Sequence, residues 1–167
     1  MALLRRLPYQ QFKRHLPRQN TMRSTLKQPK VWLTITAAVL ALLCIMPALN
    51  QALINSSGTG QISMVKRLLA LGVVPSDDAL GRAAYNGHTA VVRTLLQAGA
   101  NPSAANEINE TALMYASENG HTEVVKLMLA YGADPNAGCR EMDPLTVARV
   151  GKHTEIVKML KQAGAKE

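Results

Sequence analysis

The feature that most constrains the fold of this chain is an internal repeat of about 33 residues. Three segments align with one another: Ala79–Asn101, Ala112–Asp134 and Pro144–Ala165. Equivalent glycines, Gly87 and Gly120, lie 33 positions apart. A period of this length is typical of chains in which each unit buries its apolar face against the next unit. The sequence therefore predicts a stack of similar units.

Each aligned segment predicts two helices joined by a Gly-His or Lys-His turn. The second helix carries apolar residues at positions i, i+1, i+4 and i+5, which form one broad helical face. Gly99, Gly132 and Gly164 follow the second helices, where a left-handed residue is needed and glycine adopts it at low cost. Strand patterns are absent, so the predicted fold class is all-α. The predicted core positions are Leu80, Ala83, Ala84, Leu113, Ala116, Leu145 and Ala148 in the first helices and Val91, Val92, Leu95, Leu96, Val124, Val125, Met128 and Leu129 in the second.

These residues resemble a known family, the ankyrin repeats. The stretch "NGHTEVVKLMLAYGADPNA", Asn119–Ala137, follows the family pattern over the second helix and the exit loop. "ETALMYA" is similar to the opening motif T-P-L-H-x-A with Ala112 in place of the proline, and "DPLTVA" keeps the proline after Asp143. The resemblance implies an ankyrin solenoid of about four helix-turn-helix units, preceded by one hydrophobic helix. The opening histidine is replaced in all units, by Gly81, Met114 and Thr146.

The stretch "NQALINSSGTGQISMVKRLLALG", Asn50–Gly72, fits the same frame as a degenerate first repeat. Gly60, Val65, Leu68 and Gly72 precede their counterparts in the next unit by 27 residues instead of 33. This shorter step predicts a shortened connection around residues 74–77. Ser56 and Ser57 replace the paired alanines, and Met64 and Leu69 take core positions.

The last repeat is predicted to be a C-terminal cap, because Lys161 stands where Leu96 and Leu129 are expected to be buried. A terminal unit has no neighbour on that side, so a polar residue is tolerated there. The predicted organisation comprises a basic segment 1–30, a hydrophobic segment 31–49, the degenerate repeat 50–76, and repeats 77–106, 107–139 and 140–167.

The positive charge of the chain is concentrated before the repeats. The chain has a net charge of +8, and residues 1–30 hold eight basic residues and no acidic one. The remaining eleven basic residues equal the eleven acidic residues, so the body is neutral overall. A nucleic-acid-binding domain needs a basic stripe on its folded part, so no nucleic-acid partner is expected.

The hydrophobic segment 31–49 predicts a transmembrane helix or the apolar region of a signal peptide. Thr34 and Thr36 are its only polar side chains, and nineteen helical residues just reach across a hydrocarbon core of about 30 Å. A buried core helix is the alternative, but it would normally carry a polar stripe. Cleavage after Ala48 or Ala52 would leave an exported protein, and no cleavage would leave an anchor.

Basic flanking residues are expected to stay in the cytoplasm, which places the repeats on the trans side of a membrane, in the periplasm of a bacterium. An acid-free, Arg-bearing leader also fits a mitochondrial presequence, with the inner membrane as the destination. Met22 begins a signal-like segment of ordinary length, so residues 1–21 are a candidate for an over-extended start.

Catalytic and metal-binding patterns are missing from the sequence. His88, His121 and His153 recur at one repeat position, but neighbouring repeats lie about 10 Å apart, too far for shared ligation at about 2 Å. Cys44 lies in the apolar run and Cys139 stands alone in the repeats, so no disulfide within the domain is expected. We therefore predict no enzymatic activity, no cofactor and no metal.

What remains is an interaction surface. In ankyrin folds the partner usually meets the concave side, made by the hairpin tips and the short helices. Carried over by position, this resemblance implies a partner-binding set of Arg82, Tyr85, Asn86, Glu107, Ile108, Asn109, Tyr115, Glu118, Asn119, Arg140, Glu141, Met142 and Val150. The predicted function is a monomeric, non-enzymatic scaffold that binds another protein. The alternatives are an inhibitor or protector of an exported enzyme, and a cytoplasm-facing membrane adaptor.

Overall fold

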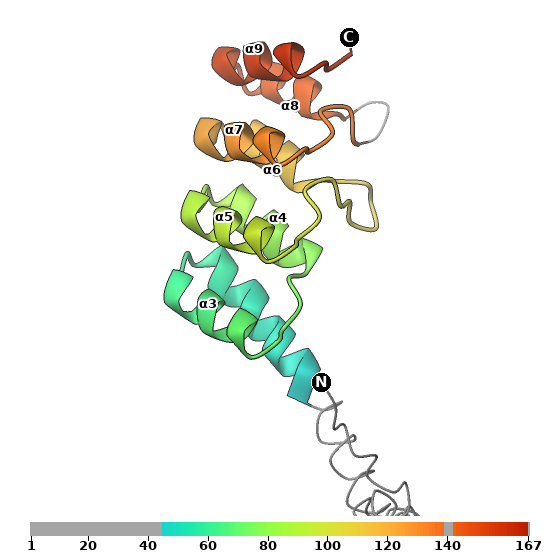
Figure 1. The fold of residues 1–167 in the computed structure, drawn as a ribbon. Helices are drawn as coiled ribbons and strands as arrows, with labels where there is room; N and C mark the ends of the chain where they lie inside the picture. The colour runs from blue at the N-terminus through green and yellow to red at the C-terminus, as the bar shows by residue number, and fades with distance from the viewer. Residues whose placement is uncertain (1–44, 139–141, 167) are drawn as a thin grey trace, which may run out of the picture. The chain divides into compact units, whose positions relative to one another are not determined.

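The structure, a computed structural model, describes residues 45–138 and 142–166 (Figure 1). Residues 1–44, which include the basic segment and most of the hydrophobic segment, lie outside the described part, as do Arg140 and Glu141. The described residues belong to one compact unit that begins at Ile45. Its helices are residues 45–58, α3 (Ile62–Ala70), α4 (Asp77–Tyr85), α5 (Thr89–Gln97), α6 (Ala112–Glu118), α7 (Thr122–Ala130), α8 (Pro144–Val150) and α9 (Thr154–Gln162).

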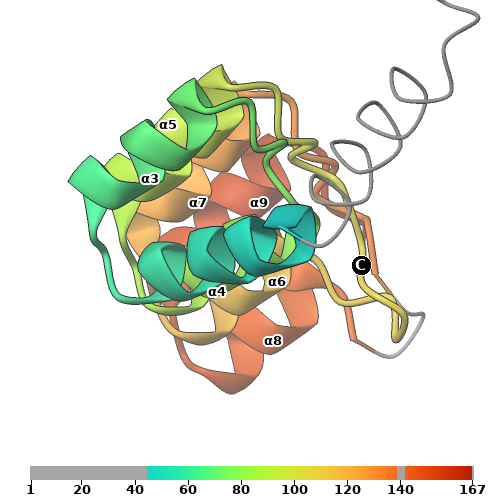
Figure 2. The ribbon, with the colours of Figure 1, turned by 90° about the horizontal axis from the view of Figure 1, so that it is seen from below.

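The helices form two parallel layers. Helix 45–58 and helices α4, α6 and α8 make one layer, and helices α3, α5, α7 and α9 make the other, with the long connections projecting at one side (Figure 2). Helices α4 and α6 each pack on the second helix of their own unit and on the first helix of the next unit, and α8 packs on α9. This confirms the all-α, helix-turn-helix solenoid that the repeat predicts.

The core fills the space between the two layers. Nearly all of the predicted apolar positions are buried, from Val65 in the first unit to Ala148 in the last, and Leu53 and Leu160 are buried with them. Leu129 is only half-buried, and Leu127 on the same helix is buried instead. Met64 is 41% exposed because the first unit has a described neighbour on one side only. Lys161 of the last unit is exposed, as expected for a cap.

The first helices of the units start with short polar side chains instead of the missing histidine. Ser76, Thr111 and Asp143 precede α4, α6 and α8, and each side chain accepts a hydrogen bond from a backbone N–H of the first turn. Such caps satisfy donors that a helix start leaves free, which is worth about 1 kcal/mol each. The helix starts are therefore fixed without the family's histidine.

The recurring histidines connect consecutive repeats. His88 Nε2 lies 3.1 Å from the carbonyl oxygen of Gly58, and His121 Nε2 lies 2.8 Å from that of Tyr85. His153 Nε2 lies 2.9 Å from the carbonyl oxygen of Glu118. Because a carbonyl only accepts hydrogen bonds, each Nε2 carries the proton. These histidines therefore connect each unit to the preceding one by a hydrogen bond.

Glycine is required where those imidazole rings lie. Gly87 and Gly120 have φ values of 71° and 75°, which other residues rarely adopt. A Cβ on Gly87 would lie 2.6 Å from the ring of His121, and one on Gly120 would lie 2.5 Å from the ring of His153. The Gly-His turn is thus one steric unit that spans two repeats.

The first repeat begins earlier than predicted. Its first helix includes residues 45–49, which the sequence assigns to the hydrophobic segment, and Leu49 packs against the core. The connection between α3 and α4 is short, as the 27-residue step predicts. None of the helices in the described ranges is both long enough and apolar enough to cross a membrane.

Candidate functional site

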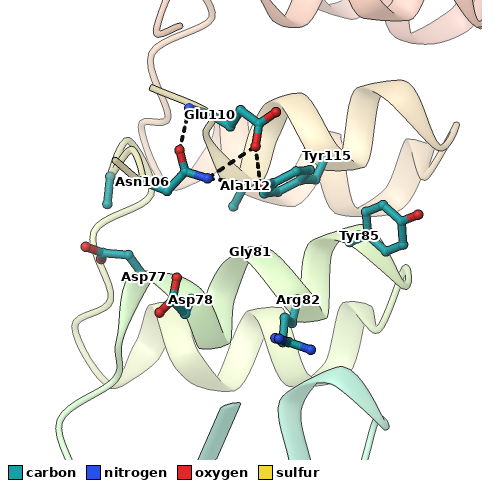
Figure 3. Close-up of a pocket in the computed structure, with 10 residues that line it drawn as sticks. Asp77, Asp78, Gly81, Arg82, Tyr85, Asn106, Glu110, Ala112 and Tyr115 are labelled. Atoms are coloured by element: carbon teal, nitrogen blue, oxygen red, sulfur yellow. Dashed lines mark hydrogen bonds between the residues drawn. The ribbon is translucent and has the colours of Figure 1, made fainter. Parts of the chain in front are cut away.

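A cavity of about 390 Å³ lies between helices α4 and α6, under the connection that leads into α6 (Figure 3). It is bordered by the start and the outer face of α4, by the loop before α6, and by one tyrosine from each helix. The lining residues are Asp77, Asp78, Gly81, Arg82, Tyr85, Ala104, Asn106, Glu110, Ala112 and Tyr115.

One wall of the cavity is a hydrogen-bonded network around Tyr115. Its hydroxyl donates to Glu110 Oε2 at 2.5 Å, and Asn106 Nδ2 donates to the same hydroxyl at 3.1 Å and to Glu110 Oε2 at 3.2 Å. Asn106 Oδ1 accepts hydrogen bonds from the backbone N–H groups of Ile108 and Glu110. The network therefore ties the loop tip to helix α6 and holds the Tyr115 ring in place.

The Tyr115 phenol is strongly biased towards its neutral form. Its pKa is raised to about 12, mainly by burial and then by the hydrogen bond to Glu110 and the charges of Glu110 and Asp78, against a lowering contribution from Asn106. A negative charge disfavours a second one nearby, so the carboxylates oppose phenolate formation. The Asp78 contribution indicates that this carboxylate acts electrostatically across the cavity, from α4 to α6.

The absence of a side chain at Gly81 leaves the space between the two helices. A Cβ there would lie 3.4 Å from the ring of Tyr115, which is a tight contact. Tyr85 closes the end of the cavity, with its ring edge-on to that of Tyr115 at a centroid distance of 6.0 Å. It is 51% exposed, so a partner can reach it. The cavity is thus aromatic on one side and acidic on the other.

A second hollow of about 600 Å³ continues from the cavity along the loop before α6. It shares Asp77, Asp78 and Asn106 with the cavity and adds Glu107 and Ile108 at the loop tip. Ile108 is 65% exposed. The loop closes through Asn109, whose φ of 60° lies in the left-handed region. We call the two hollows together the α4–α6 groove.

Several predicted partner-binding residues meet in this groove. Arg82, Tyr85 and Tyr115 line the cavity, and Glu107 and Ile108 line its continuation. Arg82 points away from Tyr115 and towards the first repeat (Figure 3), where its side chain lies 3.7 Å from the position of a Cβ on Gly58.

Other predicted residues lie outside the groove. Asn86 and Asn119 follow helices α4 and α6, and their side chains donate to backbone carbonyl oxygens of Arg82 and Tyr115. Glu118 contributes its carbonyl oxygen to the histidine of the next repeat. Met142 and Val150 are exposed in the fourth repeat, and Arg140 and Glu141 lie outside the described residues.

Sequence reasoning missed most of the cavity wall, because only Arg82, Tyr85 and Tyr115 of its lining were predicted. Asp77, Asp78, Gly81, Asn106 and Glu110 line it and were not predicted. The sequence held a signal for Asp77 and Asp78. They begin helix α4, whereas the equivalent helix of the fourth repeat, α8, begins with proline. Gly81 offered another signal, since glycine inside a helix normally costs stability and needs a reason.

The described site combines a hollow with polar groups whose positions are fixed by hydrogen bonds. Within residues 45–138 and 142–166 no group of three or more His, Cys, Asp or Glu side chains could hold a metal ion. Among the groups of the described residues, Tyr115 has the one large pKa shift, and this shift keeps its phenol neutral. The groove presents a pre-shaped surface with fixed hydrogen bonds, which suits recognition of another molecule.

Comparison with known proteins agrees with the geometry. The family model described as "Ankyrin repeats (3 copies)" matches residues 80–167, which is more than half of the chain. These residues run from within helix α4 to the C-terminus and contain the lining of the groove except Ser76, Asp77 and Asp78. No curated protein matches the chain.

Proposed function

This chain belongs to the ankyrin-repeat family, whose repeats are protein–protein interaction modules, and from that premise we propose that it binds its partner protein through the α4–α6 groove. The observation that carries the proposal is the cavity between α4 and α6, with its two tyrosines and its fixed loop. Tyrosine is enriched at the energetic centres of interfaces. A wall held by hydrogen bonds loses little entropy on docking.

We propose further that the repeats act on the trans side of a membrane. The support is the sequence order of a basic segment followed by an uncharged apolar segment, residues 31–49, placed directly before the repeats. The anchored or exported repeats would present the groove to an exported protein. A mitochondrial inner-membrane location is the second candidate.

The groove assignment is tested by capturing the partner with the full chain and its Tyr85→Ala variant. Tyr131→Ala is the matched control, because Tyr131 is 39% exposed and follows α7 in the other helix layer. We expect Tyr85→Ala to weaken partner binding at least tenfold, by about 1.4 kcal/mol or more, and Tyr131→Ala to leave it unchanged. Equal retention of the partner by both variants would assign binding to another face.

Location and role need separate experiments. A reporter that is active only outside the cytoplasm, fused after Glu167, should be active; cytoplasmic activity would favour the adaptor alternative. Membrane fractionation with N-terminal sequencing separates an anchor from a cleaved signal. If the captured partner is an enzyme, its activity with and without the chain separates a scaffold, which leaves it unchanged, from an inhibitor or protector.

A further inference from the structure

We propose that the α4–α6 groove receives a basic side chain of the partner, arginine in preference to lysine, between its carboxylates and Tyr85. This inference rests on the proposed function and adds the chemical class of the contact. The site is the cavity as a whole, in which space, an exposed aromatic ring and unused hydrogen-bond acceptors coincide.

The side-chain hydrogen-bond donors of the Tyr115 wall are already used. The Tyr115 hydroxyl donates its one proton to Glu110, and the two protons of the Asn106 amide go to Glu110 and to the Tyr115 oxygen. Carboxylates have no donors, so Asp77, Asp78 and Glu110 offer only acceptor oxygens. A ligand that fits this wall must therefore bring donors.

The charge of the cavity points the same way. Its lining includes three carboxylates and one guanidinium, and that guanidinium, on Arg82, is directed away from Tyr115 (Figure 3). Glu107 adds a fourth carboxylate in the adjoining hollow. A cationic ligand is the complement of this surface, and complementary charge favours one class of partner over others.

Arginine fits better than lysine for two reasons. Its planar group carries five donors and can contact two acceptors at once, whereas lysine carries a compact charge with three donors. It also stacks on aromatic faces, which adds a cation–π contact. Tyr85 supplies an exposed ring next to the carboxylates.

The test uses the full chain in a neutral detergent and three labelled nine-residue peptides. The peptides alternate glycine with arginine, lysine or glutamine, and binding is measured by fluorescence anisotropy at low salt. We expect the arginine peptide to bind most tightly, the lysine peptide less tightly, and the glutamine peptide not measurably. Failure of the arginine peptide to bind at millimolar concentration, or equal binding of the glutamine peptide, would overturn the proposal.

The double variant Asp77→Asn, Asp78→Asn locates the binding, since it leaves the Tyr115 network intact. We expect it to weaken binding of the arginine peptide about tenfold, because two exposed charge pairs are lost. Glu123→Gln, Glu155→Gln is the matched control: it makes the same charge change, also in first turns of helices, but in the other layer. Equal weakening by both double variants would reduce the effect to overall charge and overturn the proposal.

Two outcomes separate this inference from the function on which it rests. If Tyr85→Ala loses the partner but Asp77→Asn, Asp78→Asn retains it, the groove binds the partner without a basic contact, and only this inference falls. Sedimentation of the chain alone gives the other outcome. If the chain self-associates and the aspartate variant abolishes this, the occupant of the groove would be residues 1–30 of a second copy, which hold eight basic residues. That result would overturn the proposal that the groove binds a different protein.

Discussion

Two junctions of the solenoid, between α4 and α6 and between α6 and α8, are alike on one side and different on the other. On the side of the Gly-His turns both have a glycine under an imidazole ring, and the ring bonds to a carbonyl of the preceding repeat. On the side of the first helices, Gly81 and Tyr115 border an open cavity. Met114 and Val147 take the corresponding positions one repeat later and are both buried.

This difference shows which positions the repeat leaves free. The core and the Gly-His turns hold neighbouring repeats together. The space between consecutive first helices can therefore be either filled by side chains or left as a hollow. Met114 and Val147 bury apolar surface where Gly81 and Tyr115 leave a polar hollow. In this chain the hollow junction is the candidate binding site, and the filled junction serves as its internal control.

The largest contrast is expected from truncating the equivalent positions. Met114→Ala should destabilise the fold by about 2–5 kcal/mol, because it removes a buried side chain and leaves a cavity. Gly81→Ala should change stability by less than about 1 kcal/mol, since the gain in helix propensity offsets the tight contact with Tyr115. Urea unfolding followed by circular dichroism measures both. Similar losses in the two variants would mean that the junctions are not packed differently.

The turn side should respond equally at both junctions. Gly87→Ala and Gly120→Ala each force a Cβ into an imidazole ring and into a left-handed conformation. The conformation costs about 1–2 kcal/mol and the lost histidine bond about 1 kcal/mol, so each variant should lose about 2–3 kcal/mol in urea unfolding. Gly99→Ala is the control, because a Cβ there has open space and only the conformational cost remains. A large difference in stability between Gly87→Ala and Gly120→Ala would show that the Gly-His contact is not equivalent in the two junctions.

Much of this framework was predictable from sequence because it repeats. The period, the two helices per unit and the apolar positions recur three times, so errors at one position are corrected by the others. Leu129 packs against the core but is only partly buried, and the burial of Leu127 on the same helix was not predicted. The start of the first helix was missed because an apolar run such as residues 45–49 is expected in a membrane segment as well as in a helix of the repeats.

The candidate site was predictable only in part, since its residues do not repeat. Tyr85 and Tyr115 were found by position within the repeat, and they meet in the structure. Glu110 and Asn106 gain their importance from a loop that folds back on Tyr115, and this contact has no sequence period. Periodicity therefore locates the binding face, whereas the hollow depends on individual contacts.

Alkaline pH should distinguish the two junctions through Tyr115. Its pKa of about 12 in the folded state exceeds the ordinary value of 10.0. Between these pH values the unfolded chain releases the proton more readily than the folded chain, so this group's contribution to stability is complete below pH 10 and falls as pH rises towards 12. Thermal unfolding should show the wild type losing stability relative to Tyr115→Phe over this range.

Glu110→Gln tests the cause of that shift. Removing the carboxylate removes the largest charge effect on the phenol, so the pKa of Tyr115 should fall. Val147→Ala in the other junction provides the comparison, because no ionisable group stands at that position and the alkaline loss should persist. An unchanged phenolate titration in Glu110→Gln would contradict the network that forms the cavity wall.

The smallest effect is expected at the outer end of the stack, where the Gly-His rule is broken. Lys152 occupies the position of Gly87 and Gly120 and has a φ of 61°, but no described repeat follows to place a ring against it. Lys152 therefore has only the free-energy cost of its left-handed conformation. A glycine would remove this cost, but it would also give the unfolded chain more conformational freedom. Lys152→Gly should stabilise the fold by about 0.5–1 kcal/mol in urea unfolding, whereas Gly120→Lys should destabilise it more than Gly120→Ala. If Lys152→Gly were destabilising, the side chain of Lys152 would have a structural role, and glycine in the inner turns could not be attributed to the ring of the next repeat alone.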